Sequence, residues 1–98
     1  MYYFEAIVRP QFAERLCQDL IAWSGISDLS ATEIIGSGRR FIEGDIGGYA
    51  IDMLPKVLVA GCVVDEERED LIDVICTDAR TGRVGDGKIF LYRIVGEA

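Results

Sequence analysis

Two groups of residues in this sequence have types and spacing that suit the binding of a small anion. The first is the run Gly85-Asp86-Gly87-Lys88. Glycines let successive backbone N–H groups approach a ligand closely, and the lysine adds a compact positive charge suited to phosphate. The same four residues also suit a tight turn that leads into a strand, so on their own they leave both interpretations open.

The second group consists of three cations near the two ends of a glycine-rich stretch: Arg39, Arg40 and Lys56. They stand out because the chain as a whole is acidic, with 17 Asp and Glu against 10 Lys and Arg and a net charge of −7. A small anion would suit this cluster. The alternative is that the three cations pair at the surface with nearby acids, namely Glu43, Asp45 and Asp52.

The composition disfavours several classes of function. The sequence has no histidine, so the commonest general base and the commonest metal ligand are both missing, and we expect neither an enzyme nor a metal site. The acidic balance repels phosphate backbones and anionic membranes, which argues against a nucleic-acid partner. Three cysteines without CxxC spacing argue against disulfides and zinc, and we expect them to be reduced and buried: Cys17, Cys62 and Cys76.

No signal-peptide pattern opens the sequence, and no apolar run reaches the roughly 18 residues of a membrane span. We therefore expect a soluble, cytoplasmic protein that does not insert into a membrane. Its 98 residues are enough for one domain, and half of them are apolar, enough for a core and for a subunit contact.

The elements that must position the two groups can be read from the periodicity. Strands are predicted at residues 2–8, 26–35, 56–64 and 88–95, and helices from Pro10 to Gly25 and from Asp65 to Arg80. A long loop is predicted at about 36–55 and a glycine-rich loop at 81–87. The order β-α-β-β-α-β is the α+β ferredoxin-like fold, in which both helices cover one sheet face. The other face is then available for a subunit interface.

Four segments together resemble the PII signalling proteins. The run TGRVGDGKIF at 81–90 resembles the C-terminal signature of that family, and EAIVRP at 5–10 resembles its first strand and the start of its first helix. The runs TEIIGSGR at 32–39 and DMLPKV at 52–57 resemble the two ends of its long T-loop. This resemblance covers nearly the whole chain.

The resemblance implies a homotrimer that binds a nucleotide in each of three clefts between subunits and docks on partner proteins through its T-loop. In this chain, the residues implied to hold phosphates are Gly85, Asp86, Gly87 and Lys88. Gly38 and Arg39 are implied to close the same site at the base of the T-loop. Ser30 stands where the family has a threonine near the nucleobase, and Cys62 lies on the strand whose backbone the base contacts.

Departures from the family pattern refine these expectations. The shorter T-loop lacks the modified tyrosine at its tip, and Tyr49 is nearer its exit, so uridylylation is not expected. Arg40 replaces a glutamine that helps hold 2-oxoglutarate and Mg²⁺, and a guanidinium cannot coordinate a metal. The sequence given ends at Ala98, before the paired arginines that grip outer phosphates, which moves the expected preference from ATP toward ADP or AMP.

These departures are similar to those of the divergent PII-like proteins associated with carboxysomes and inorganic-carbon transport. That likeness implies adenine nucleotides and bicarbonate as ligands, with the co-ligand at Arg39, Arg40 and Lys56. It also implies a protein target such as a transporter or a protein of carbon metabolism.

Four other interpretations fit parts of the sequence. A PII-like sensor of nitrogen status through 2-oxoglutarate is the nearest to the main interpretation. An acylphosphatase-like enzyme shares the fold, but the junction at 8–11 lacks the glycine loop that this enzyme uses. An RNA-binding module would stack bases on Phe90 and Tyr92, although the charge is unfavourable. A metal-tolerance trimer of the CutA type shares the architecture, but the lack of histidine weakens it.

Overall fold

The computed structural model describes residues 1–41, 49–82 and 87–96, with the side chains of 37–41 and 49–52 excepted. The elements in chain order are β1 (Tyr2–Val8), α1 (Pro10–Ile21), β2 (Ile26–Phe41), β3 (Tyr49–Val63), the short 3-10 helix η1 (Asp65–Glu67), α2 (Arg68–Ala79) and β4 (Gly87–Arg93). The predicted β-α-β-β-α-β order is confirmed.

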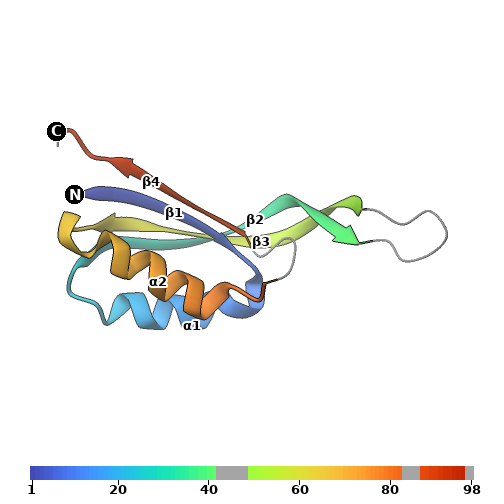
Figure 1. The fold of residues 1–98 in the computed structure, drawn as a ribbon, viewed down its shortest axis with the longest axis horizontal. Helices are drawn as coiled ribbons and strands as arrows, with labels where there is room; N and C mark the ends of the chain where they lie inside the picture. Colours follow the sequence, from blue (N-terminus) through green and yellow to red (C-terminus); the bar gives the residue numbers. More distant parts are fainter. Residues whose placement is uncertain (42–48, 83–86, 97–98) are drawn as a thin grey trace.

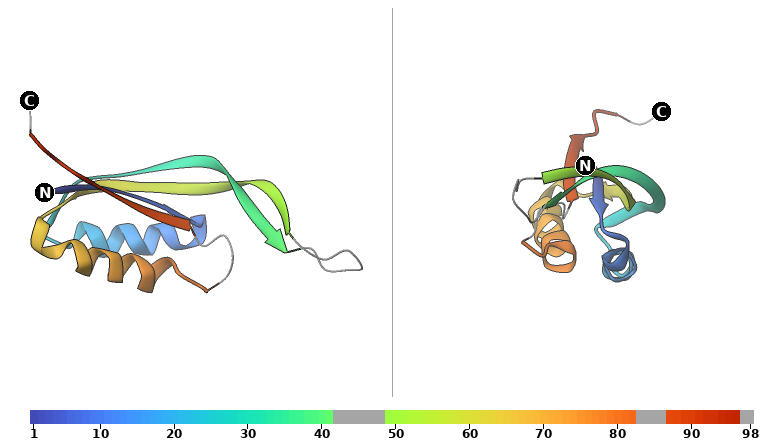
Figure 2. Two further views of the ribbon diagram at one scale, coloured as in Figure 1. Left: turned by 45° about the horizontal axis from the view of Figure 1, so that its top comes forward. Right: turned by 90° about the vertical axis from the view of Figure 1, so that its right-hand side faces the viewer.

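The four strands form one antiparallel sheet in the order β2-β3-β1-β4. Both helices lie on the same side of this sheet, as Figures 1 and 2 show, so the molecule has two layers. The structure therefore has the predicted ferredoxin-like fold. We call the side that carries the helices the helix face and the other side the open face.

Local sequence explains why these elements form and how they pack. Alternate residues of β1 are buried, with Phe4, Ala6 and Val8 directed at the helices. Pro10 begins α1 at a position where its missing N–H is not needed. Together the two layers enclose one apolar core, whose buried members are Phe4, Ala6, Val8, Ala13, Leu16, Leu20, Val57, Val59, Val63, Leu71, Ile75 and Ala79.

A β-bulge near the start of β2 sets which side chains reach the open face. Ser27 pairs with Cys62 and Ser30 with Ala60, so two residues of β2 stand opposite Gly61 alone. Asp28 adopts a left-handed backbone with φ 54°, which aspartate tolerates better than most residues. Without this extra residue Ser30 would pair with Val59 and point toward the helices. The bulge therefore exchanges the face to which each later side chain of β2 points.

The prediction of a loop at about 36–55 is wrong for the two ends of this range. The β2–β3 ladder continues without a break from Ile35↔Pro55 to Phe41↔Tyr49, so 36–41 and 49–55 are strand. Gly36 and Gly38 are compatible with a loop, but their backbone pairing with Leu54 and Asp52 on β3 holds them extended. In Figure 1 the hairpin projects well beyond the ends of the helices. Residues 42–48, in the middle of the predicted loop, lie outside the described residues.

Smaller differences concern the ends of elements. α1 ends at Ile21 and not at Gly25, because a turn that includes the bond from Trp23 N–H to the Leu20 carbonyl intervenes. All three cysteines are free but half-buried, where full burial was expected. Across the described part of the chain, neither helix has the length and apolar character required to cross a membrane.

Candidate functional site

Four of the predicted site residues have described side chains, and strand pairing puts all four on the open face. Ser30 pairs with Ala60, and Lys56 with Ile34. Cys62 pairs with Tyr3, and Lys88 with Ile7. Paired residues project on the same side of a sheet, and the helix face is marked by the buried residues of β1. In the sequence these residues belong to separate predicted elements, and the sheet brings them to one surface.

Cys62 and Ser30 lie toward one end of this face. Cys62 is half-buried and is flanked by Ser27 on β2 and Tyr3 on β1. The ring of Tyr3 stacks on that of Tyr92, with centroids 6.1 Å apart and planes 28° apart. Desolvation raises the pKa of the Tyr3 phenol, and the nearby Glu5, Cys62 and Tyr92 act in the same direction. This end of the face combines aromatic rings with small polar side chains.

Lys88 lies toward the opposite end, on the edge strand β4, and its side chain is exposed. Gly87 precedes it with φ +133°, and its backbone runs close to that of β1. A Cβ at position 87 would fall 1.8 Å from the carbonyl oxygen of Ile7. The glycine at 87 is thus required by the sheet itself, which supports the turn interpretation of this residue without removing the cation beside it.

Lys56 is buried, with 7% of its surface exposed, where the hairpin leaves the body of the sheet. Its aliphatic stem packs near Gly36, since a Cβ there would lie 3.5 Å from the Lys56 Cγ. It helps line a pocket of about 400 Å³ between the start of α1 and the hairpin, together with Pro10, Glu33, Ile34, Ile35 and Pro55. Glu33 and Lys56 are the two charged residues of this lining.

The remaining predicted residues are described in part or not at all. The backbone of Gly38 pairs with Asp52, that of Arg39 with Ile51 and that of Arg40 with Ala50. The side chains of these two arginines lie outside the described residues, and so do Gly85 and Asp86. Their predicted roles in binding stay predictions.

One contact near the Lys88 end of the sheet was not expected from the sequence. The Arg9 Nη1 donates a hydrogen bond to the Thr81 Oγ1 at 3.2 Å, although 72 residues separate them in the chain. It ties the β1–α1 junction to the segment that follows α2, where the glycine-rich run begins. Only the β-α-β-β-α-β topology, which brings both helix ends to one side, could have suggested it.

The described residues contain no candidate metal-binding cluster. No group of three or more His, Cys, Asp or Glu side chains close enough to hold an ion occurs among residues 1–41, 49–82 and 87–96. The open face instead offers hydroxyl, thiol, aromatic and ammonium groups, which can bind a ligand by stacking, hydrogen bonds and charge.

The order of strands and the two-layer architecture define a ferredoxin-like α+β protein. The family model for "Nitrogen regulatory protein P-II" matches residues 1–95, and the chain belongs to this family. The family consists of regulatory proteins, which confirms the expectation that the chain is not an enzyme.

Individual relatives agree with this assignment. The chain is 36% identical over 93 residues to the nitrogen regulatory protein P-II of Pasteurella multocida, covering 92% of this chain and 82% of that one. It is 32% identical over 91 residues to the nitrogen regulatory protein GlnK of Escherichia coli K12, covering 90% and 80%. The structure of GlnK from B. subtilis has the same fold, with a TM-score of 0.71 at 22% identity, covering 96% and 84%.

Proposed function

We propose that the protein is a cytoplasmic PII-like regulator that senses adenine nucleotides in clefts between the subunits of a homotrimer. The nucleotides are ADP, AMP and ATP, with ADP or AMP preferred. Gly85, Asp86, Gly87 and Lys88 would hold the phosphates, Gly38 and Arg39 would close the site, and Ser30 and Cys62 would lie beside the base. The observation that carries the proposal is the presence of two separate groups of these residues on one open face.

The spacing of these groups favours a site made by two chains. Cys62 and Lys56 are six residues apart on one extended strand, which corresponds to about 20 Å. Lys88 and Ser30 lie on the two edge strands of the sheet. In one chain, the residues proposed to lie beside the base and those proposed to hold the phosphates are therefore too far apart to form one site. A second copy of the chain would complete each half-site with the other half. The open face also exposes Phe90 and Tyr92, at 39% and 50%, which such a contact would cover.

Bicarbonate is the proposed co-ligand, bound by Arg39, Arg40 and Lys56 at the base of the T-loop. Lys56 supports this proposal because it is a buried cation at the point where the hairpin leaves the sheet. An anion there would offset the mutual repulsion of the three cations and favour one arrangement of the loop, which is what a switch requires. The T-loop would then act on a protein target such as a transporter or another protein of inorganic-carbon metabolism.

A second candidate is a nitrogen regulator that responds to 2-oxoglutarate. It is favoured by relatives that are named nitrogen regulatory proteins, such as those of Pasteurella multocida and Escherichia coli K12, which are 36% and 32% identical to this chain. Arg40 argues against it, because this residue stands where the family pattern has the glutamine that helps hold Mg²⁺ and 2-oxoglutarate.

Calorimetric titration separates the two candidates. ADP is titrated into the protein alone, with bicarbonate, and with 2-oxoglutarate and Mg²⁺, at fixed pH and ionic strength. Linkage requires that a co-ligand which tightens ADP binding is itself bound more tightly in the presence of ADP. We expect bicarbonate to tighten ADP binding and 2-oxoglutarate to have little effect. The reverse result would favour the nitrogen sensor, and equal ADP affinities in all three conditions would refute the coupling.

A further inference from the structure

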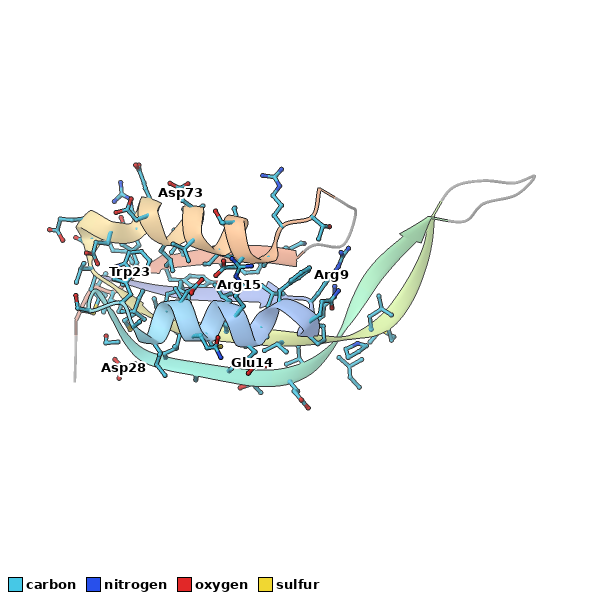
Figure 3. The ribbon with its side chains drawn as sticks, turned by 90° about the horizontal axis from the view of Figure 1, so that it is seen from below. Arg9, Glu14, Arg15, Trp23, Asp28 and Asp73 are labelled. Carbon is cyan, nitrogen blue, oxygen red and sulfur yellow. The ribbon has the colours of Figure 1, made fainter. Side chains whose placement is uncertain are left out.

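Arg9 lies at the junction of β1 and α1, and its backbone is held by both elements. It follows Val8, the last residue of β1, and occupies the N-cap position of α1. Its carbonyl accepts a hydrogen bond from the Phe12 N–H at 3.0 Å. Figure 3 shows Arg9 at the end of the helix pair where α1 begins and α2 ends. The half-buried guanidinium therefore extends from a well-defined point of the backbone.

An arginine at this position is unfavourable for α1 itself. Helices favour Ser, Thr, Asp or Asn at the N-cap, where the side chain accepts a backbone N–H, and the Arg9 side chain makes no such bond. A cation is also disfavoured at the positive end of a helix dipole. The Arg9 guanidinium instead contacts Thr81, two residues beyond the end of α2, where the negative end of that helix favours a cation. The contact with the segment after α2 is therefore the one that accounts for an arginine here.

Both ends of the glycine-rich run at 81–87 are attached to the same short stretch of chain. Thr81, at its start, accepts the hydrogen bond from the Arg9 Nη1 at 3.2 Å. Gly87, at its end, pairs with Val8, and its backbone lies against the carbonyl oxygen of Ile7. Three consecutive residues of the β1–α1 junction thus hold the two ends of the run.

The two attachments differ in kind. The one at Gly87 is backbone pairing within the sheet, and Lys88 continues the same strand. The one at Thr81 is a contact between two side chains at the surface, and Thr81 itself lies in neither a helix nor a strand. Removing the Thr81 contact would therefore loosen the start of the run while its end stays fixed. A phosphate held between the start of the run and Lys88 would then be placed less well.

We propose that Arg9 is a positioning residue for the phosphate-binding end of the nucleotide site, and that it acts through Thr81 by setting the start of the glycine-rich run relative to Lys88. This inference rests on the proposed nucleotide function and adds to it a residue from outside the run. Because Arg9 acts through the Thr81 hydroxyl, removing either group should have the same effect on ADP affinity.

Calorimetric titration of ADP into the wild type and matched threonine variants tests this role. Thr81→Val replaces the hydroxyl with a methyl group and keeps the charge of Arg9. We expect it to weaken ADP binding roughly two- to tenfold, the range of one hydrogen bond. Thr81→Ser keeps the hydroxyl and should bind ADP like the wild type. Thr77→Val makes the same change at an exposed threonine on α2 and should also leave the affinity in place.

Arg9→Ala, alone and combined with Thr81→Val, separates a positioning role from direct contact with the ligand. If Arg9 acts through Thr81, both substitutions remove the same contact, so the double variant should bind ADP no more weakly than Arg9→Ala. Additive losses of affinity would place the guanidinium against the nucleotide and overturn the positioning role. A loss in Arg9→Ala with none in Thr81→Val would do the same.

Two measurements without nucleotide complete the test. The ¹⁵N order parameter of Gly82 should fall in Thr81→Val and not in Thr77→Val. The urea midpoints of both variants should stay near that of the wild type, since the lost contact is exposed, whereas a merely structural contact would lower the midpoint and leave ADP affinity unchanged. Wild-type protein that does not bind ADP would overturn the nucleotide function and this inference with it. Equal ADP affinities in the wild type and Thr81→Val, or an unchanged Gly82 order parameter, would overturn this inference alone.

Discussion

The backbone of Gly87 passes so close to the carbonyl oxygen of Ile7 that a Cβ on residue 87 would lie 1.8 Å from it. Its φ of +133° is also one that residues with a side chain rarely adopt. This glycine is therefore part of the β1–β4 sheet edge as well as of the GDGK run.

Gly87→Ala should lower the free energy of unfolding by about 2 kcal/mol or more, because both backbone strain and a steric clash are introduced. Urea unfolding followed by circular dichroism measures the loss. Gly82→Ala is the matched control, since Gly82 also has positive φ, at 80°, but no atom of the described residues lies within 4 Å of the added Cβ. A loss no larger in Gly87→Ala than in Gly82→Ala would contradict the close approach.

Lys88→Ala is the cleaner probe of phosphate binding, since Lys88 is exposed and we expect its removal to leave the fold intact. Removing one charge-assisted contact worth about 1.5–3 kcal/mol should weaken ADP binding roughly ten- to hundredfold. Calorimetry gives the affinity, and Arg93→Ala, an exposed cation at the other end of β4, is the control. Equal ADP affinities in the wild type and in Lys88→Ala would leave GDGK as a turn only.

Gly61 should be intolerant of any side chain, because it stands alone opposite the bulge of β2. A Cβ there would lie 3.0 Å from the Ser27 carbonyl oxygen and 3.1 Å from Cε1 of the buried Phe4. We expect Gly61→Ala to lower the free energy of unfolding by about 1–3 kcal/mol through overpacking. Gly36→Ala, whose nearest contact is an ordinary 3.5 Å, should change it much less. Equal effects of the two substitutions would show that the bulge region can adjust.

The sequence predicted the fold well where one signal dominated. The β-branched and aromatic run at residues 2–8, Pro10 at the start of α1 and the acidic residues at 65–67 before α2 each indicated an element that the structure contains. The glycines at 36 and 38 led to a wrong prediction of a loop, because glycine is compatible with a loop and with a strand. Long-range pairing with Leu54 and Asp52 makes this segment a strand.

The candidate site was predictable in its residue types and less so in its geometry. Nothing in the run around Asp28 indicated a bulge, although aspartate is one of the few residues that accept its backbone conformation. That bulge decides whether Ser30 faces the helices or the open face. The hydrogen bond from Arg9 to Thr81 was likewise not predicted, since it joins residues 72 positions apart that only the topology brings together.

Arg40→Gln tests the proposed co-ligand. If Arg40 contributes to a cationic site at the base of the hairpin, removing its charge should weaken the effect of bicarbonate on ADP affinity. The glutamine should restore some Mg²⁺-dependent response to 2-oxoglutarate, because an amide oxygen can coordinate a metal and a guanidinium cannot. ADP titrations with each co-ligand measure both effects. A bicarbonate effect of the same size in Arg40→Gln and in the wild type would exclude this arginine from the site.

Native mass spectrometry of the protein with ADP tests the central claim most directly, because one spectrum reports both the number of chains and the number of nucleotides bound. Sites that are completed only between subunits should give assemblies of three chains of 10.8 kDa carrying up to three ADP, and no ADP on single chains. Single chains as the main species, or trimers that remain free of ADP at saturating concentration, would contradict a nucleotide sensor built from three copies of this chain.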